Sequence, residues 1–202
     1  MITLYGIEWS RAKYVLFTLE ELELEYRHIK INPFKEEKYA PEYLKLNPLA
    51  QVPTLVDDEI VLTESMAINF YLVKKYGAKK LWIDQLEYEA YIYKWTFFAV
   101  TQLETACINI AIQKALTAEK DRDLKQLKQS EQSLKKPLHV LETSLDEKNF
   151  LVADQFSVAD INIASALSFA HNGQFDFSPY KNVARYLNNI LSRPAYMKFS
   201  TN

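Results

Sequence analysis

The residues best suited to chemistry stand at the predicted starts of two helices in the first third of the chain. Ser10 and Arg11 precede one apolar series with helical spacing, and Glu64 and Ser65 precede another. A helix N-terminus offers free backbone amides and positive potential, and a serine hydroxyl adds one hydrogen-bond donor. Both places therefore suit an anion. A plain helix cap is the alternative role for Ser10, and the spacing alone leaves both interpretations open.

Other polar residues are excluded from catalysis by their spacing. His28, His139 and His171 lack the i, i+4 or HExxH spacing of a metal site, so we expect no metal. Ser157 and Asp160 stand three residues apart before an apolar run. That is the spacing of a helix capping box, so we interpret this pair as a folding element and not as a catalytic pair.

The composition rules out nucleotide-binding loops and a global attraction to polyanions. The chain has 202 residues and three glycines, Gly6, Gly77 and Gly173, which lie too far apart for a P-loop or a Rossmann fingerprint. With 24 basic and 26 acidic residues the net charge is −2. We therefore expect no nucleic acid and no membrane surface as a partner.

The cysteine count and the apolar runs point to a cytoplasmic protein. Cys107 is the single cysteine, which excludes an intramolecular disulfide and a multi-thiolate zinc site and fits a reducing compartment. Residues 1–5 show no basic segment followed by a long apolar run, so no signal peptide is expected. No apolar run approaches the roughly 18 residues of a membrane span.

The elements that must position these residues change character along the chain. Residues 1–77 are predicted to run β-α-β, then α, then β-β-α. The strands are expected at 2–5, 26–31, 53–56 and 60–62, and the helices after Ser10, around 42–46 and from 63–65 to Gly77. Residues 78–86 are predicted to be a linker and 87–202 to be helical throughout. Pro137 is expected to bend or break its helix near Lys136.

Four segments, in this order, resemble the cytosolic glutathione transferase superfamily over essentially the whole chain. The Ser10-Arg11-Ala12 start is most similar to the chi class and to theta-like and phi-like bacterial members. The resemblance implies an α/β thioredoxin-like domain that binds glutathione (1–77), a linker (78–86) and an all-α domain (87–202) that contributes the electrophile pocket. It also implies a homodimer. The four segments are Leu4-Tyr5-Gly6 with Ser10-Arg11-Ala12, Asn47 to Pro53, Leu62 to Ser65 with Ala67-Ile68, and Phe156 to Ile161.

The resemblance implies that glutathione is the co-substrate and that its thiol must ionise near neutral pH. A thiol has a pKa of about 8.5, which positive potential and donated hydrogen bonds lower. Ser10 is the expected donor to the thiolate. Tyr5 is an alternative because other classes use an early tyrosine, and Arg11 is another because a nearby cation favours a thiolate. No cysteine stands near Ser10, which argues against thiol transfer through the enzyme.

The resemblance also assigns residues that bind the tripeptide. The bond before Pro53 is expected to be cis, which turns the N–H and C=O of Val52 toward the cysteinyl backbone of glutathione. Glu64 is expected to bind the γ-glutamyl ammonium, and Ser65 with the helix amides the α-carboxylate. Gln51 matches a residue that contacts the glutathione backbone.

Two positions in the resemblance concern the glycyl end of glutathione. Lys38 and Tyr39 fall where phi-like relatives meet the glycyl carboxylate. Lys38 also belongs to the charged run 35–38, which is typical of a solvated surface.

Relatives place glycines where this chain has Glu23 and Asp58, so we expect a tolerated turn at Asp58 and a locally altered turn at Glu23.

The expected function is that of a glutathione transferase that conjugates the thiolate to hydrophobic electrophiles in detoxification. One alternative is a binding or carrier protein of the same fold with little catalytic activity. Another is a glutathione-dependent isomerase of the zeta type. Turnover of haloarene, isothiocyanate, peroxide and maleyl-type substrates distinguishes the three.

Overall fold

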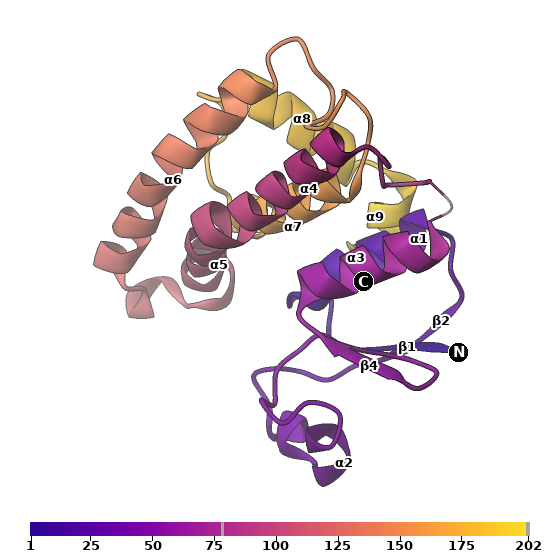
Figure 1. The fold of residues 1–202 in the computed structure, drawn as a ribbon. Helices are drawn as coiled ribbons and strands as arrows, with labels where there is room; N and C mark the ends of the chain where they lie inside the picture. The colour runs from indigo at the N-terminus through magenta and orange to yellow at the C-terminus, as the bar shows by residue number, and fades with distance from the viewer. Residues whose placement is uncertain (78, 201–202) are drawn as a thin grey trace. The chain divides into compact units, whose positions relative to one another are not determined.

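The computed structural model describes residues 1–77 and 79–200 (Figure 1). The chain divides into two compact units, Met1–Trp82 with Pro194–Asn202, and Ile83–Arg193. One residue of the predicted linker, 78, and the last two of the predicted helical domain, 201 and 202, lie outside the described residues.

The first unit is built on a four-stranded mixed sheet in the order β2-β1-β3-β4. β1 (Ile2–Tyr5) pairs in parallel with β2 (Tyr26–Ile29) and antiparallel with β3 (Thr54–Asp57), which forms a hairpin with β4 (Ile60–Thr63). The predicted strand at 26–31 is thus two residues shorter than expected. Because one helix, α1 (Ala12–Glu21), lies between β1 and β2 and another, α2 (Pro41–Leu44), between β2 and β3, the order β-α-β-α-β-β-α of a thioredoxin-like domain is confirmed.

Helices α1 (Ala12–Glu21) and α3 (Ser65–Tyr76) pack together over this sheet, as Figure 1 shows. Their apolar faces and the centres of β1 and β3 form the core of the first unit, in which Leu4, Leu55 and Leu72 are fully buried. The last helix, α9 (Pro194–Ser200), packs on α1. A 3-10 turn, η1 (Glu36–Tyr39), and the short helix α2 (Pro41–Leu44) complete the unit.

The predicted helix at 42–46 begins one residue earlier and ends two residues earlier than expected. Pro41 occupies its first position, where the missing N–H and the fixed φ of proline suit a helix start. The two glycine-replacing residues both adopt positive φ, 55° at Glu23 and 53° at Asp58. Both positions therefore place a side chain in the left-handed region that favours glycine.

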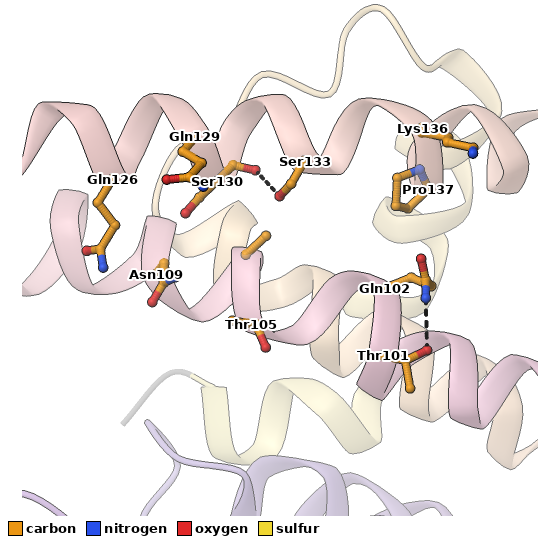
Figure 2. Close-up of a pocket in the computed structure, with 11 residues that line it drawn as sticks. Thr101, Gln102, Thr105, Asn109, Gln126, Gln129, Ser130, Ser133, Lys136 and Pro137 are labelled. Carbon is orange, nitrogen blue, oxygen red and sulfur yellow. Dashed lines mark hydrogen bonds between the residues drawn. The ribbon is translucent and has the colours of Figure 1, made fainter.

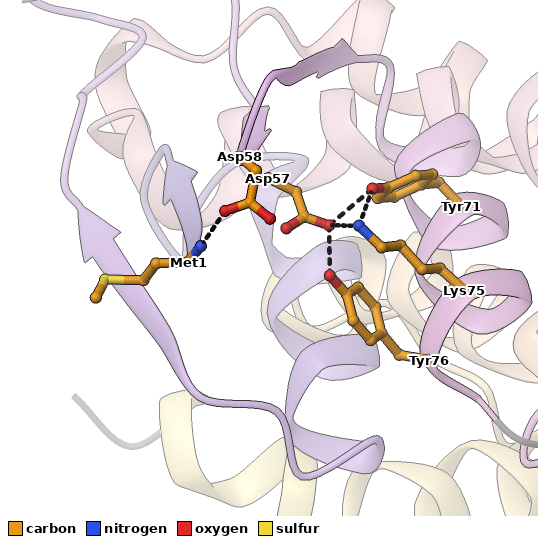
Figure 3. Close-up of polar contacts among 6 residues, drawn as sticks. All are labelled: Met1, Asp57, Asp58, Tyr71, Lys75 and Tyr76. Atoms are coloured by element: carbon orange, nitrogen blue, oxygen red, sulfur yellow. Dashed lines mark hydrogen bonds and ion pairs between the residues drawn. The ribbon is translucent and has the colours of Figure 1, made fainter.

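A buried carboxylate ties the β3–β4 hairpin to the C-terminal half of α3 (Figure 3). One oxygen of Asp57, Oδ2, accepts hydrogen bonds from Tyr71 (2.7 Å), Lys75 (2.7 Å) and Tyr76 (2.6 Å). Burial by itself raises the pKa of Asp57, but these hydrogen bonds and the charge of Lys75 outweigh it and lower the pKa to about 2. The ionised form is therefore the one that the folded protein binds.

We expect Asp57→Asn to lower the free energy of unfolding by about 1–3 kcal/mol, because the variant loses charge-assisted hydrogen bonds. The pKa of Asp57 is lower in the folded protein than the roughly 3.9 of an unfolded chain. Its stabilisation is therefore complete above about pH 4 and is lost as the pH falls toward 2. Urea unfolding between pH 2 and 7 measures this. The neighbouring Asp58→Asn is the control, since Asp58 is 72% exposed and contacts only the N-terminal amine among the described residues; an equal loss in both variants would contradict the prediction.

The second unit is a helical assembly around the buried helix α7 (Val158–Asn172). One long helical stretch runs through α4 (Leu86–Phe98), the π-helical η2 (Ala99–Glu104), α5 (Thr105–Ala111) and the π-helical η3 (Ile112–Leu116). The 3-10 turn η4 (Glu119–Asp121) and α6 (Leu124–Ser144) come next, and α6 packs on α5, η2 and α8. Helix α8 (Lys181–Leu191) packs on both α6 and α7. Among the described residues, no helix combines the length and the apolar character needed to cross a membrane.

The predicted break at Pro137 is wrong, because this residue lies inside α6, a continuous helix of 21 residues. A proline inside a helix costs about 3 kcal/mol. Leu134, Leu138 and Leu141 flank it on the buried face and are fully enclosed. Their packing against the rest of the unit compensates for the lost hydrogen bond. The predicted capping box of Ser157 and Asp160 at the start of α7 is confirmed.

Candidate functional site

A small pocket in the first unit is formed where three segments meet. The start of α1, the loop that leads into β3 and the junction of β4 with α3 each contribute to its wall. Six of the ten residues singled out from the sequence line this pocket, and four do not. Its lining comprises Arg11, Asn47, Leu49, Gln51, Val52, Pro53, Thr63, Glu64 and Ser65.

The loop into β3 presents main-chain groups to the pocket. The bond between Val52 and Pro53 is cis, as expected. Among the described residues, none forms a hydrogen bond with the main chain of Val52. Its N–H and C=O are therefore available to an extended peptide, which would pair with them as an added strand.

Two buried residues that the sequence analysis did not select hold this loop in place. The Tyr43 hydroxyl and the Asn47 side-chain amide both donate to the carbonyl oxygen of Gln51, at 2.5 and 2.8 Å. Both also contact Thr54 Oγ1 at the start of β3. Asn47 begins the Asn47–Pro53 segment that carries the family resemblance, so the motif contained a signal for its role. Tyr43 reaches the loop from α2, which no local pattern predicts.

The junction of β4 with α3 has an unusual backbone and an unpaired hydroxyl. Glu64 has a φ of 68°, and α3 begins at the next residue. Non-glycine residues with positive φ often occur at ligand sites. Ser65 Oγ is fully buried and has no hydrogen-bond partner among the described residues. Buried polar groups are nearly always paired, so a hydroxyl without a partner beside the free amides of a helix N-terminus marks a place for an anionic group.

Arg11 and Glu64 face each other across the pocket. Their side chains form an ion pair of 3.6 Å, with Arg11 30% exposed and Glu64 63% exposed. The pair connects the starts of α1 and α3. Because it is partly solvated, its energy is small, and a ligand ammonium can take the place of the guanidinium beside Glu64.

Ser10 lies at the start of α1 but outside the lining of this pocket. The helix begins at Ala12 with Arg11 in the cap position, so the cap lies one residue after Ser10, the residue expected to occupy it. Its hydroxyl accepts a hydrogen bond from the Ala12 amide (3.1 Å) and donates one to the Ile7 carbonyl (2.7 Å). To donate to a sulfur, Ser10 Oγ must therefore exchange its bond with Ile7 for the ligand.

Gly6 permits the close approach of these segments. It has a φ of 138°, and a Cβ at this position would lie 2.7 Å from Ala12 Cβ and 3.3 Å from Val52 Cβ. Any side chain would push the start of α1 away from the cis-proline loop.

The other three residues selected from the sequence are not part of the pocket lining. Tyr5 packs its ring against Tyr43 at 5.7 Å between centroids. Lys38 and Tyr39 belong to η1, where the Lys38 ammonium lies 5.0 Å from the Tyr39 ring and Tyr39 is 51% exposed. The structure therefore does not bring these three side chains together with the six that line the pocket.

The thiol of Cys107 is not suited to act as a nucleophile. Cys107 is fully buried in α5, and burial raises the pKa of its thiol. A thiol that is protonated and without solvent contact is not a nucleophile.

Comparison with known proteins gives a consistent assignment along the chain. The family model for the glutathione S-transferase N-terminal domain matches residues 1–74, and that for the C-terminal domain matches residues 91–194. The glutathione S-transferase GstB of Escherichia coli K12 is 34% identical over 98% of this chain and 97% of its own length. The glutathione S-transferase hmp2 of Hypomyces subiculosus is 31% identical, with the same coverage. The crystal structure of glutathione transferase F2 from Populus trichocarpa is 30% identical and superimposes with a TM-score of 0.89 over 98% of this chain and 97% of that one.

Proposed function

The chain belongs to the cytosolic glutathione transferase superfamily, and on this premise we propose how its residues divide the work of the transfer reaction. The protein is a glutathione S-transferase that conjugates glutathione to hydrophobic electrophiles. The observation that carries the proposed division is the unpaired, buried Ser65 hydroxyl at the N-terminus of α3, next to the free main chain of Val52.

The γ-glutamyl end of glutathione binds at the start of α3. Ser65 Oγ and the first amides of α3 donate to its α-carboxylate. The Glu64 carboxylate accepts from its ammonium, which takes the place of the Arg11 guanidinium now 3.6 Å away. The cysteinyl backbone pairs with Val52, and the Gln51 side chain contacts the peptide next to it. Lys38 and Tyr39 contact the glycyl carboxylate.

The cysteinyl sulfur lies near the start of α1. Ser10 donates to the thiolate, and the N-terminal amides of α1 supply positive potential. Arg11 adds a positive charge in the same pocket, and it is the first alternative to Ser10, with Tyr5 as the second. The thiolate then attacks the electrophilic carbon with its lone pair and forms the carbon–sulfur bond. On a haloarene the halide departs with its electron pair, and on an isothiocyanate the carbon–nitrogen π electrons move to the nitrogen, which takes up a proton. Positioning of the two reactants supplies much of the rate.

The organisation around this site follows the superfamily. Residues 1–77 form the glutathione-binding domain, 78–86 the linker, and 87–202 the helical segment that contributes the electrophile pocket, with its last helix, α9, packed on α1 of the first unit. The protein forms a homodimer and acts in detoxification. A cytoplasmic location is supported by Cys107, a buried thiol that is not paired in a disulfide.

The test of this proposal is turnover of glutathione with haloarene, isothiocyanate, peroxide and maleyl-type substrates. We expect conjugation with at least one of the first two. Binding of glutathione without any turnover would leave a carrier protein, and isomerisation of the maleyl substrate alone would indicate a zeta-type enzyme. Each of these two outcomes would overturn the proposed transfer reaction.

We expect Ser65→Ala to raise the KM for glutathione about tenfold and to leave kcat nearly unchanged. The variant removes one hydrogen bond to the charged α-carboxylate, a bond of about 1.5–3 kcal/mol. Initial rates with varied glutathione measure the effect. Cysteinylglycine, which lacks the γ-glutamyl group, is the control thiol. An equal loss with both thiols would show that Ser65 supports the fold and does not bind this carboxylate.

A further inference from the structure

A second cavity lies entirely within the helical unit. It is a cleft of about 480 Å³ between the wall formed by η2 and α5 and the wall formed by α6 (Figure 2). It shares no residue with the glutathione pocket. Its lining comprises Thr101, Gln102, Thr105, Ala106, Asn109, Gln126, Gln129, Ser130, Ser133, Lys136 and Pro137.

The lining is rich in hydroxyls and side-chain amides and has one charge. Figure 2 shows Gln126, Ser130 and Ser133 on the α6 wall above Thr105 and Asn109 on the opposite wall. Serine, threonine, asparagine and glutamine side chains both donate and accept hydrogen bonds. The lining contains no acidic residue and no aromatic ring, and Ala106 and Pro137 are its small apolar members.

Several of these groups are not engaged with the rest of the protein. The side chains of Thr105, Asn109, Gln129 and Lys136 form no hydrogen bond or ion pair with any described residue. Two other lining pairs contact each other locally, Gln102 with Thr101 and Ser133 with the Ser130 carbonyl. The cleft therefore offers hydrogen-bonding groups from both walls together with one uncompensated ammonium.

Both walls also depart from regular α-helix at the cleft. Thr101 and Gln102 belong to the π-helical η2, and π segments inside α-helices frequently occur at functional sites. On the facing wall, Pro137 lacks an N–H, so it cannot donate to the carbonyl of Ser133 four residues earlier. The helix thus leaves one carbonyl without its usual donor beside the cleft.

From these features we propose that the cleft binds a small polyhydroxylated anion, a sugar acid or a sugar phosphate. Ligand hydroxyls match the side-chain amides, the hydroxyls and the Ser133 carbonyl, because each of these can pair with a group that both donates and accepts. Lys136 supplies the single countercharge. A volume of about 480 Å³ suits one such molecule, and the absence of any large apolar residue from the lining disfavours the hydrophobic electrophiles of the transferase reaction.

Binding to the intact protein tests this by isothermal titration calorimetry with gluconate and with glucose 6-phosphate. We expect saturable binding of at least one of them, and which one binds identifies the anionic group. Sorbitol, propionate and inorganic phosphate are the comparison probes, and each should bind at least about tenfold more weakly because it lacks either the charge or the hydroxyls. Inorganic phosphate binding as well as the sugar phosphate would overturn the proposal.

Variants locate the binding at the cleft. Asn109→Ala combined with Gln129→Ala should weaken binding about tenfold or more, and Lys136→Gln should weaken it for the anion. Lys135→Gln, an adjacent exposed lysine that does not line the cleft, is the matched control. Melting temperature and glutathione turnover should stay unchanged in all of them, so failure of the transferase assay and failure of this proposal are separate results.

Three further outcomes would overturn the proposal. The first is no saturable binding by either anion. The second is an equal loss of affinity in Lys135→Gln and Lys136→Gln, which would indicate general surface charge. The third is a change of oligomeric state in the cleft variants without any ligand binding, measured by light scattering, which would mean that a second copy of the chain occupies the cleft.

Discussion

Replacement of Asp160 with alanine is expected to lower the free energy of unfolding by about 3–5 kcal/mol, because it removes the shared acceptor of a buried hydrogen-bond network. The Asp160 carboxyl is fully buried at the start of α7. It accepts hydrogen bonds from the Leu151 amide (3.0 Å), the Ser157 amide (2.9 Å), the Ser157 hydroxyl (3.0 Å) and the Tyr186 hydroxyl (3.1 Å). Alanine would leave these buried donors without partners, and each such group carries a desolvation penalty of about 1–3 kcal/mol.

The effect is large because one carboxyl joins three parts of the helical unit. The Leu151 amide belongs to the turn before α7, Ser157 caps α7, and Tyr186 comes from α8. Burial raises the pKa of Asp160 to about 6, against the opposing effect of hydrogen bonds from Leu151, Ser157 and Tyr186. At neutral pH the group is therefore ionised, which agrees with four donors that point at it.

Urea unfolding followed by circular dichroism measures the loss. Asp154→Ala is the matched control, since this exposed carboxylate accepts hydrogen bonds from the Asn149 and Phe150 amides in the same loop. We expect the control to lose about 1 kcal/mol or less. Equal losses would mean that the network around Asp160 adds nothing to the ordinary stability of a loop carboxylate.

The capping box was predictable because its signal is local. A serine and an acidic residue three positions apart before an apolar run specify a helix start by their own hydrogen bonds. The cis bond before Pro53 was predicted only through the resemblance, since proline by itself gives a small chance of it. The β-α-β-α-β-β-α order followed from alternating periodicities, which is also a local property.

The incorrect and missing predictions concern interactions between distant segments. Pro137 does not break α6, because the leucines beside it are held by packing that the local pattern does not contain. The Asp57 anchor joins residues up to 19 positions apart, and Tyr43 reaches the Gln51 carbonyl from a different element. The two π segments of the long helix have no signal in the apolar periodicity, although one of them lines the polar cleft.

Ser10 shows the same limit within the proposed catalytic machinery. The sequence identified a hydroxyl at a helix start, but it could not show that the Ile7 carbonyl already accepts its proton. A donor that must exchange partners contributes the difference between two hydrogen bonds and not the whole of one. Ser10 thus stabilises the thiolate less than a donor without a partner would. The amides at the start of α1 and the charge of Arg11 then supply a larger share of the thiolate stabilisation.

For Ser10→Ala we expect the pKa of the bound glutathione thiol to rise by about 1–2 units, which corresponds to about 1.4–2.7 kcal/mol of thiolate stabilisation. Turnover at neutral pH should fall about 10- to 100-fold, and the KM for glutathione should change little, because the tripeptide is held at Val52, Glu64 and Ser65. Ultraviolet absorbance of the thiolate, titrated against pH with saturating glutathione, measures the pKa directly.

The thiol pKa separates a catalytic role of Ser10 from a structural one. Loss of the contacts with Ile7 and Ala12 alone would lower stability by about 0.5–2 kcal/mol and leave the pKa of the bound thiol unchanged. Arg11→Gln and Tyr5→Phe are the companion variants. If Arg11→Gln raises the thiol pKa and Ser10→Ala does not, the guanidinium stabilises the thiolate. A rise in Tyr5→Phe alone would require the tyrosine to leave its contact with Tyr43 when glutathione binds. If none of the three variants changes the pKa, the amides at the start of α1 are the remaining donors, and the thiolate is stabilised by the helix N-terminus itself.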